Sequence, residues 1–118
     1  MTEPLAVAKG TLDMIVLRAL SWAPMHGFEI VEWVETHATN AIEVTDAAVY
    51  QSLYRMEQRG LVAATWGLTA NNRRARYYKV TAEGNAYFRA ESRRWMRYAE
   101  TVTELLTAPL AAKPRRDA

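Results

Sequence analysis

Apolar residues recur with helical spacing in four stretches of the chain and alternate with polar residues in two others. The helical spacing predicts four helices, over residues 11–22, 27–38, 45–59 and 82–107. The alternation predicts a hairpin of two strands, over residues 61–69 and 75–81, because successive side chains of a strand point to opposite faces. Residues 42–44 are a candidate third strand for this hairpin, and residues 5–9 a candidate helical turn. The predicted fold class is mainly α with a small β-hairpin.

The third predicted helix, residues 45–59, has two chemically different sides. Val49, Leu53 and Met56 recur at i, i+4 and i+7 and are expected to face the core. The other side is rich in hydrogen-bond donors and short of acids, and it comprises Tyr50, Gln51, Tyr54, Arg55 and Gln58. A helix followed directly by a two-stranded ribbon is typical of a winged helix-turn-helix, in which the helix enters the major groove of DNA. Partial burial of the tyrosines under the hairpin is the alternative.

The segment that joins the two predicted strands, residues 70–74, is polar, turn-forming and strongly basic. Cations at such a tip would bind DNA phosphates, because each neutralised phosphate releases counterions. The candidate DNA-backbone contacts of the hairpin are Asn72, Arg73, Arg74, Arg76 and Lys79. Asn71 and Asn72 also suit a tight turn. A merely solvated hairpin tip stays open as the other interpretation.

The last predicted helix carries a seven-residue apolar repeat, which is typical of a helix that packs lengthwise against another helix. Met14 and Leu17 place further apolar surface on a second side of the first predicted helix, which suggests a partner subunit there, and a plain buried helix is the competing explanation. The expected dimerisation contacts are Met14, Leu17, Phe88, Trp95, Tyr98, Val102, Leu105 and Leu106. The predicted domains are a winged helix-turn-helix over residues 1–81, a dimerisation helix over 82–108 and a basic, disordered tail over 109–118.

Trp95 lies midway along this last helix and is the candidate effector-binding residue, since an indole can stack on a planar ligand between subunits. Phe88 and Tyr98 could line the same space. An ordinary aromatic core between two subunits is the competing interpretation. The other tryptophans are expected in the core, and they are Trp22, Trp33 and Trp66.

The charge of the chain is unevenly distributed. Residues 1–60 hold four Lys or Arg and eight Asp or Glu, a net charge of −4, whereas residues 61–118 hold eleven and five, a net charge of +6. This asymmetry indicates a polyanionic partner for the second half, although a solvated helix face with a basic tail would give the same numbers.

Composition also bears on the function classes. The chain has 118 residues, of which 50% are hydrophobic, and this predicts one globular domain. Cysteine is absent, which excludes disulfides and thiolate zinc sites. His26 and His37 are too far apart in sequence for a metal-binding pair, and no phosphate-binding glycine loop occurs, so neither an enzyme nor a cofactor is expected. No apolar run approaches the roughly 20 residues that span a bilayer, and a cytoplasmic protein is expected.

With these residues laid out, the chain resembles the PadR family of bacterial transcriptional regulators, in its branch with a single C-terminal helix. The resemblance covers roughly residues 9–107. Its blocks are KGTLD and LRAL, MHGFEI, VY, LYRME with RGL, WG and NNRRARYY, in this order. It implies a homodimeric winged-helix repressor whose third helix binds a palindromic operator. It also implies release by a small, flat, hydrophobic ligand held by aromatic residues at the dimer interface.

The chain departs from the family pattern at the start of its third predicted helix. Family members commonly carry Gly-Ser-Leu-Tyr-Pro there, whereas this chain has Ala47-Ala48-Val49-Tyr50-Gln51. The missing serine hydroxyl removes one contact to DNA, while Gln51 introduces an amide that can hydrogen-bond adenine through two atoms. The operator sequence of the family therefore does not carry over. A regulator without an effector and a winged-helix protein-interaction module remain the alternatives.

Overall fold

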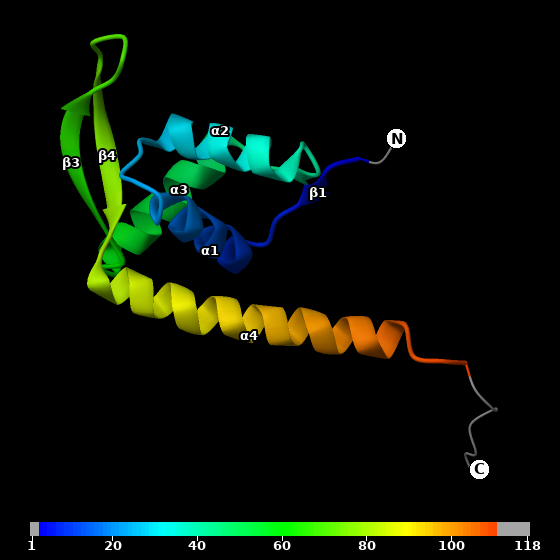
Figure 1. The fold of residues 1–118 in the computed structure, drawn as a ribbon. Coiled ribbons are helices and arrows are strands. Elements are labelled where there is room, and N and C mark those ends of the chain that lie inside the picture. Colours follow the sequence, from blue (N-terminus) through cyan, green and yellow to red (C-terminus); the bar gives the residue numbers. More distant parts are fainter. Residues whose placement is uncertain (1–2, 111–118) are drawn as a thin grey trace.

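The computed structural model describes residues 3–110, and these contain four helices joined by short connections and two small sheets (Figure 1). The elements in chain order are β1 (Leu5–Ala6), α1 (Lys9–Leu20), α2 (Gly27–Ala38), β2 (Ile42–Glu43), α3 (Asp46–Gln58), β3 (Val62–Leu68), β4 (Arg74–Val80) and α4 (Ala82–Leu106). The predicted fold class, mainly α with a small hairpin, is confirmed. Residues 111–118 of the predicted basic tail lie outside the described residues.

Side chains next to the helix starts fix where α2 and α3 begin. The Thr45 hydroxyl accepts a hydrogen bond from the Ala48 N–H at 3.1 Å, as expected of an N-cap. His26 caps α2 reciprocally with Glu29, since each side chain accepts a hydrogen bond from the backbone N–H of the other residue. After α3 the chain turns at Gly60, whose φ of +75° suits a residue without Cβ.

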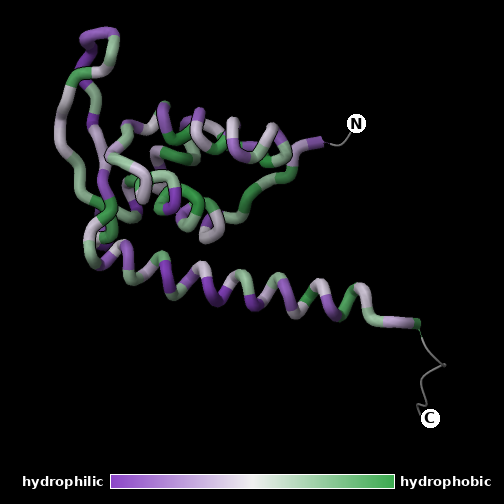
Figure 2. Tube along the Cα trace, in the orientation of Figure 1, coloured by the Kyte–Doolittle hydropathy of each residue, from purple (hydrophilic) through white to green (hydrophobic). Residues whose placement is uncertain are grey.

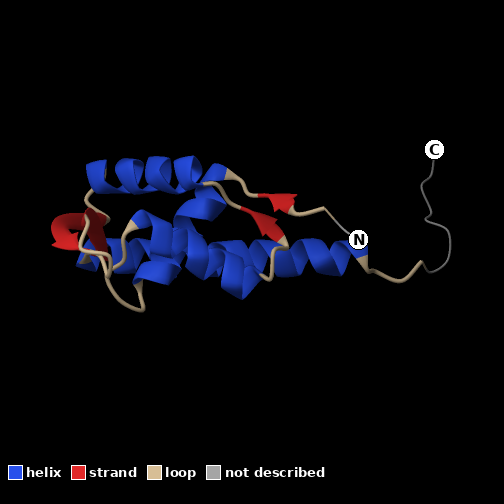
Figure 3. Ribbon diagram, turned by 90° about the horizontal axis from the view of Figure 1, so that it is seen from above, coloured by secondary structure: helices blue, strands red, loops and turns tan. Residues whose placement is uncertain are grey.

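The structure differs from the prediction in the two short segments at residues 5–9 and 42–44. Leu5–Ala6 is a strand rather than a helical turn, and it pairs in parallel with Ile42–Glu43 away from the hairpin (Figure 3). Met25 instead joins the hairpin, since it exchanges backbone hydrogen bonds of 3.1 and 2.8 Å with Tyr78. Met25 precedes α2, whereas Ile42 follows it, and twelve helical residues separate them by about 18 Å.

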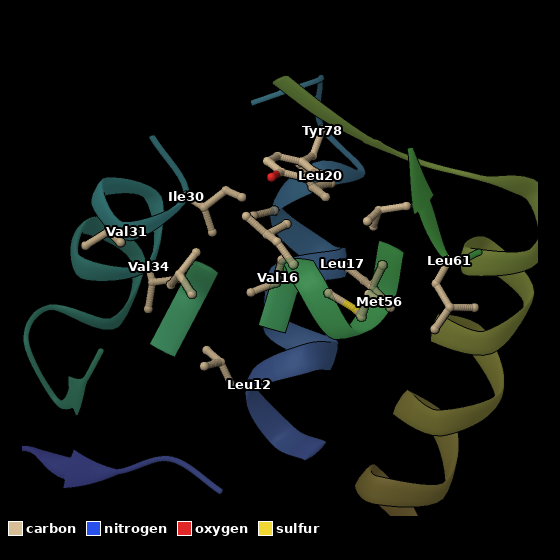
Figure 4. Close-up of a cluster of buried hydrophobic side chains, with 14 residues drawn as sticks. Leu12, Val16, Leu17, Leu20, Ile30, Val31, Val34, Met56, Leu61 and Tyr78 are labelled. Carbon is tan, nitrogen blue, oxygen red and sulfur yellow. The ribbon is translucent and has the colours of Figure 1, made fainter. Parts of the chain in front are cut away.

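The core lies between α1, α2, α3 and the base of the hairpin, and Leu17, Ile30 and Met56 are wholly buried in it (Figure 4). Leu17 is therefore not available to a partner subunit, and its prediction as a dimerisation contact is wrong. Tyr78 joins this cluster from β4, and burial raises the pKa of its phenol above the ordinary value of 10.0. Helical spacing with Val31 and Val34 predicts Phe28 on the inner side of α2, but its side chain is 54% exposed.

Helix α4 leaves the end of the hairpin and runs beside α1, then continues past it (Figure 1). Its 25 residues span about 37 Å. Tyr87 and Phe88 pack against the core, whereas Leu105 and Leu106 near the far end are 72% and 80% exposed. The second half of α4 thus carries apolar side chains that its own chain leaves uncovered.

Thr81 makes two hydrogen bonds where the hairpin meets α4. Its hydroxyl accepts from the Gly84 N–H at 3.0 Å and donates to the Gly60 carbonyl at 2.7 Å. We expect Thr81→Ala to lower the free energy of unfolding by about 1–2 kcal/mol, because it removes a helix cap and leaves a partly buried carbonyl without its partner. Urea denaturation measures this change. Thr36→Ala, at an exposed position inside α2, should be neutral or slightly stabilising; an equal loss in both variants would contradict the capping role.

Candidate nucleic-acid interface

One side of α3 is exposed along the length of the helix, and we call it the reading face. It consists of Ala47, Tyr50, Gln51, Tyr54 and Gln58. The opposite side of the helix is fixed in the core by Val49, Leu53 and Met56, which are completely buried as predicted. The two tyrosines are 49% and 64% exposed, so they are not buried under the hairpin. The reading face is therefore held on a rigid helix and open to a ligand.

Arg55, predicted to contact DNA, is bound by the protein itself. Its Nη2 lies 2.7 Å from Oδ1 of Asp13, whose side chain is 8% exposed. The same carboxylate oxygen accepts a hydrogen bond of 2.6 Å from the hydroxyl of the buried Ser52. Asp13 thus joins α1 to α3 through two charge-assisted hydrogen bonds. The contacts between Asp13, Ser52 and Arg55 were not predicted from the sequence. The available signal was an acid, Asp13, within the apolar stripe of a predicted helix.

The loop that joins β3 and β4, together with Arg74, forms the wing tip (residues 69–74). The backbone of Thr69 and Arg73 closes this loop, and the Thr69 hydroxyl accepts from the N–H groups of Asn71 and Arg73 at 3.3 and 3.2 Å. Asn72 has a φ of +64°, a left-handed conformation that asparagine tolerates. The wing tip is a hydrophilic end of the molecule in Figure 2, and its arginines, Arg73 and Arg74, are both exposed.

The other cations of the hairpin have different surroundings. Arg76 is paired with Glu57 of α3, with Nη2 and Oε2 2.9 Å apart, so its charge is compensated. Lys79 is exposed nearer the base of the hairpin. Arg74 lies over the indole of Trp66, with 4.6 Å from its guanidinium carbon to the ring centre. This cation–π contact orients Arg74 without neutralising it.

The wing tip and the reading face meet at one concave surface. A hollow of about 540 Å³ is lined by Arg73 and Arg74 of the wing tip and by Tyr50 of α3. His26, at the N-cap of α2, and Glu32, within α2, also line it. Tyr50 also lines a smaller hollow of about 370 Å³ on the reading face, with Gln51, Tyr54 and Arg55. The tertiary structure therefore brings the two groups of predicted DNA-binding residues to one side of the molecule.

Two tryptophans expected in the core are exposed. Trp66 is 60% exposed, because β3 continues past the core and only its first residues, such as Val62, pack inside. Trp22 is 67% exposed, since α1 ends at Leu20 and the indole lies in the turn that follows. Trp33 packs against the core as predicted and stacks on His37, with ring centres 4.3 Å apart.

A third hollow lies between α1 and α4, remote from the reading face. It has a volume of about 580 Å³ and is largely apolar, with Met14, Ile15, Phe88 and Trp95 among its lining residues. Tyr98 lines the neighbouring surface together with Trp95 and Met14. The predicted effector residues thus adjoin one another, and Trp95 is 45% exposed.

No helix within residues 3–110 is long and apolar enough to cross a membrane. The same part of the chain holds no group of three or more histidine, cysteine, aspartate or glutamate side chains that could bind a metal ion.

Comparison with known proteins bears on the function independently of the geometry. The model of the family described as the transcriptional regulator PadR-like family matches residues 16–90. This stretch runs from α1 through the hairpin into the first half of α4.

Three solved structures are similar over most of the chain. A PadR family transcriptional regulator from Eggerthella lenta is 29% identical, with a TM-score of 0.73 and 86% of both chains covered. A PadR-like transcriptional regulator from Bacillus cereus is 24% identical, with a TM-score of 0.73, covering 86% of this chain and 96% of that chain. A protein from Streptococcus mutans is 19% identical, with a TM-score of 0.76, covering 99% of this chain and 100% of that chain. The last two similarities concern the fold alone.

Proposed function

Because the chain belongs to the PadR-like family of transcriptional regulators, which are not enzymes, we propose that it is a homodimeric, sequence-specific DNA-binding repressor. In this proposal α3 enters the major groove and the wing tip binds the flanking phosphates. The observation that carries it is the shared concave surface, where Tyr50 of the reading face adjoins Arg73 and Arg74. This closeness supports the proposal that one duplex contacts both groups.

The proposed dimer rests on the apolar side chains of α4. Trp95, Leu105 and Leu106 are exposed along a helix whose second half extends beyond α1. Such an extended apolar surface is typical of a protein–protein contact. A second copy of α4, together with Met14 of α1, would cover it. A two-fold dimer would place its reading helices about 34–36 Å apart, one turn of DNA, and would require a palindromic site.

Footprinting on DNA from upstream of the gene for this protein tests the proposal, with the mass of the free protein measured in parallel. We expect a dimer that protects two symmetric half-sites about one duplex turn apart. A strictly monomeric protein, or a dimer that protects no DNA, would contradict the proposal. A winged-helix protein-interaction module would behave in the second way, but the exposed arginines of the wing tip do not favour it.

We propose further that a small planar hydrophobic ligand binds in the hollow between α1 and α4 and releases the repressor from DNA. The support is the largely apolar lining of that hollow and the half-exposed indole of Trp95, which can stack on such a ligand. Phe88 lines the same space, and Tyr98 adjoins it.

Trp95→Ala tests whether the indole serves the ligand or the dimer. We expect binding of planar aromatic ligands, or dimerisation, to weaken by about 10- to 100-fold, because the variant removes a large aromatic contact. Quenching of tryptophan fluorescence and analytical ultracentrifugation measure the two effects. Trp22→Ala, which removes an exposed indole outside this hollow, is the matched control. If ligand quenching and dimer mass both survive in Trp95→Ala, Trp95 has neither role, and a regulator without an effector becomes the better explanation.

A further inference from the structure

The reading face of α3 presents no free cation. The helix contains one basic residue, Arg55, and its guanidinium is bound to Asp13. Arg59, at the C-cap of α3, is not part of the reading face, and its guanidinium carbon lies 4.8 Å from the centre of the Tyr87 ring. Asp13 therefore engages the one arginine that lies within α3.

This arrangement limits which bases α3 can select. Arginine bound to the two acceptors of guanine is the commonest specific contact in the major groove, while glutamine suits the acceptor and donor of adenine. Moving Arg55 to a base would leave the buried carboxylate of Asp13 without its counter-charge and with only the Ser52 hydroxyl as a donor, which is unfavourable. Gln51 has no such constraint, because it is exposed near the middle of the reading face.

The tyrosines beside Gln51 form an apolar notch. Tyr50 and Tyr54 lie one helical turn apart and line the hollow of about 370 Å³ together with Gln51 and with Arg55, whose Nη2 is bound to Asp13. The ring of Tyr50 lies directly against Gly27, where an added Cβ would come 2.5 Å from the ring carbon Cζ. Tyr50 therefore packs against the start of α2 on one side of its ring and leaves the other side to the notch.

We infer that α3 selects A·T base pairs through this notch. Gln51 donates to N7 and accepts from the N6 amino group of an adenine, while the rings of Tyr50 and Tyr54 contact the C5 methyl group of a thymine. Arg55 is kept from guanine by Asp13. This inference rests on the proposed function, because it specifies what the reading helix recognises once it lies in the groove.

The probe is a duplex selected from a random pool by the full-length protein. In each half-site, single adenines are replaced by 7-deazaadenine, which lacks the N7 acceptor, and single thymines by uracil, which lacks the methyl group. For wild type, we expect 7-deazaadenine at one position to weaken binding by about 5- to 100-fold. We expect uracil at the same or the adjacent base pair to weaken it by about fourfold.

Variants of α3 assign these effects to residues. Gln51→Ala should bind the selected duplex about 5- to 100-fold more weakly and should no longer respond to 7-deazaadenine. Gln58→Ala removes the same side-chain amide from the last turn of the reading face and should still respond. Tyr54→Ala should respond less to uracil than wild type does, because one of the two rings that contact the methyl group is gone.

The possible outcomes distinguish a failure of this inference from a failure of the proposed DNA-binding function. A selected half-site dominated by guanine whose binding depends on Arg55 would overturn the inference and leave DNA binding intact. A wild-type protein that is indifferent to 7-deazaadenine at every adenine would do the same. Failure to enrich or bind any duplex would overturn the proposed function and this inference together.

Discussion

Arg73→Glu combined with Arg74→Glu is expected to weaken binding to duplex DNA of any sequence by about 1000-fold near 0.15 M salt. The two arginines are the exposed cations of the wing tip, and a dimer would lose four phosphate contacts. Each contact contributes a slope of about 0.9 to the dependence of log affinity on log salt, so the slope should fall by about 3 to 4. Mobility shifts over a salt series measure both quantities.

The matched control places the same charge change elsewhere. Arg89→Glu with Arg93→Glu reverses two exposed arginines of α4, one helical turn apart and remote from the wing tip. Its salt slope should stay near the wild-type value. An unchanged slope in the wing-tip variant would show that these arginines do not bind phosphate. A loss confined to one DNA sequence would instead assign them to base recognition.

Asp13→Ala is expected to lower the free energy of unfolding by about 3–5 kcal/mol, because it leaves Arg55 partly buried without a counter-charge and Ser52 without an acceptor. Native domains are stable by only about 5–15 kcal/mol, so this loss would be a substantial part of the total. Denaturant titration at a fixed protein concentration measures the loss, since dimerisation makes apparent stability depend on concentration.

A double-mutant cycle separates the ion pair from other contributions. Arg55→Ala combined with Asp13→Ala should be less destabilising than the sum of the single changes, because the double variant leaves no unpaired charge. Asp46→Ala, which removes the exposed acid in the first turn of α3, should have an effect of no more than about 1 kcal/mol. A similar small loss in Asp13→Ala would refute the bridging role.

The helices were predictable because their signals are local. The caps at Thr45 and Thr81 and the apolar spacing of Val49, Leu53 and Met56 act within one helical turn, and the structure reproduces them. The two-residue strands were not predictable in the same way. Ile42–Glu43 pairs with Leu5–Ala6, far away in the sequence, so only the packing of α1 and α2 decides its partner.

In the candidate site, too, the local features were predictable from the sequence and those that depend on tertiary packing were not. The basic hairpin tip and the chemistry of the reading face are visible in the residues themselves, and the proposed contacts of Arg73, Arg74, Tyr50 and Gln51 still rest on that chemistry. Leu17 was misassigned because a helical stripe shows which residues share a side but not which of two sides faces the core. Trp66 was misassigned because strand alternation does not show where the core ends.

The sequence by itself determined the four helices, the hairpin, their order and the charge at the wing tip, since these depend on residues a few positions apart. The tertiary structure alone decided which arginines are free. Arg55 meets Asp13 across 42 positions of the chain and Arg76 meets Glu57 across 19. An ion pair depends on distances of a few ångströms between side chains, and only the packing of α1 and the hairpin against α3 sets those distances.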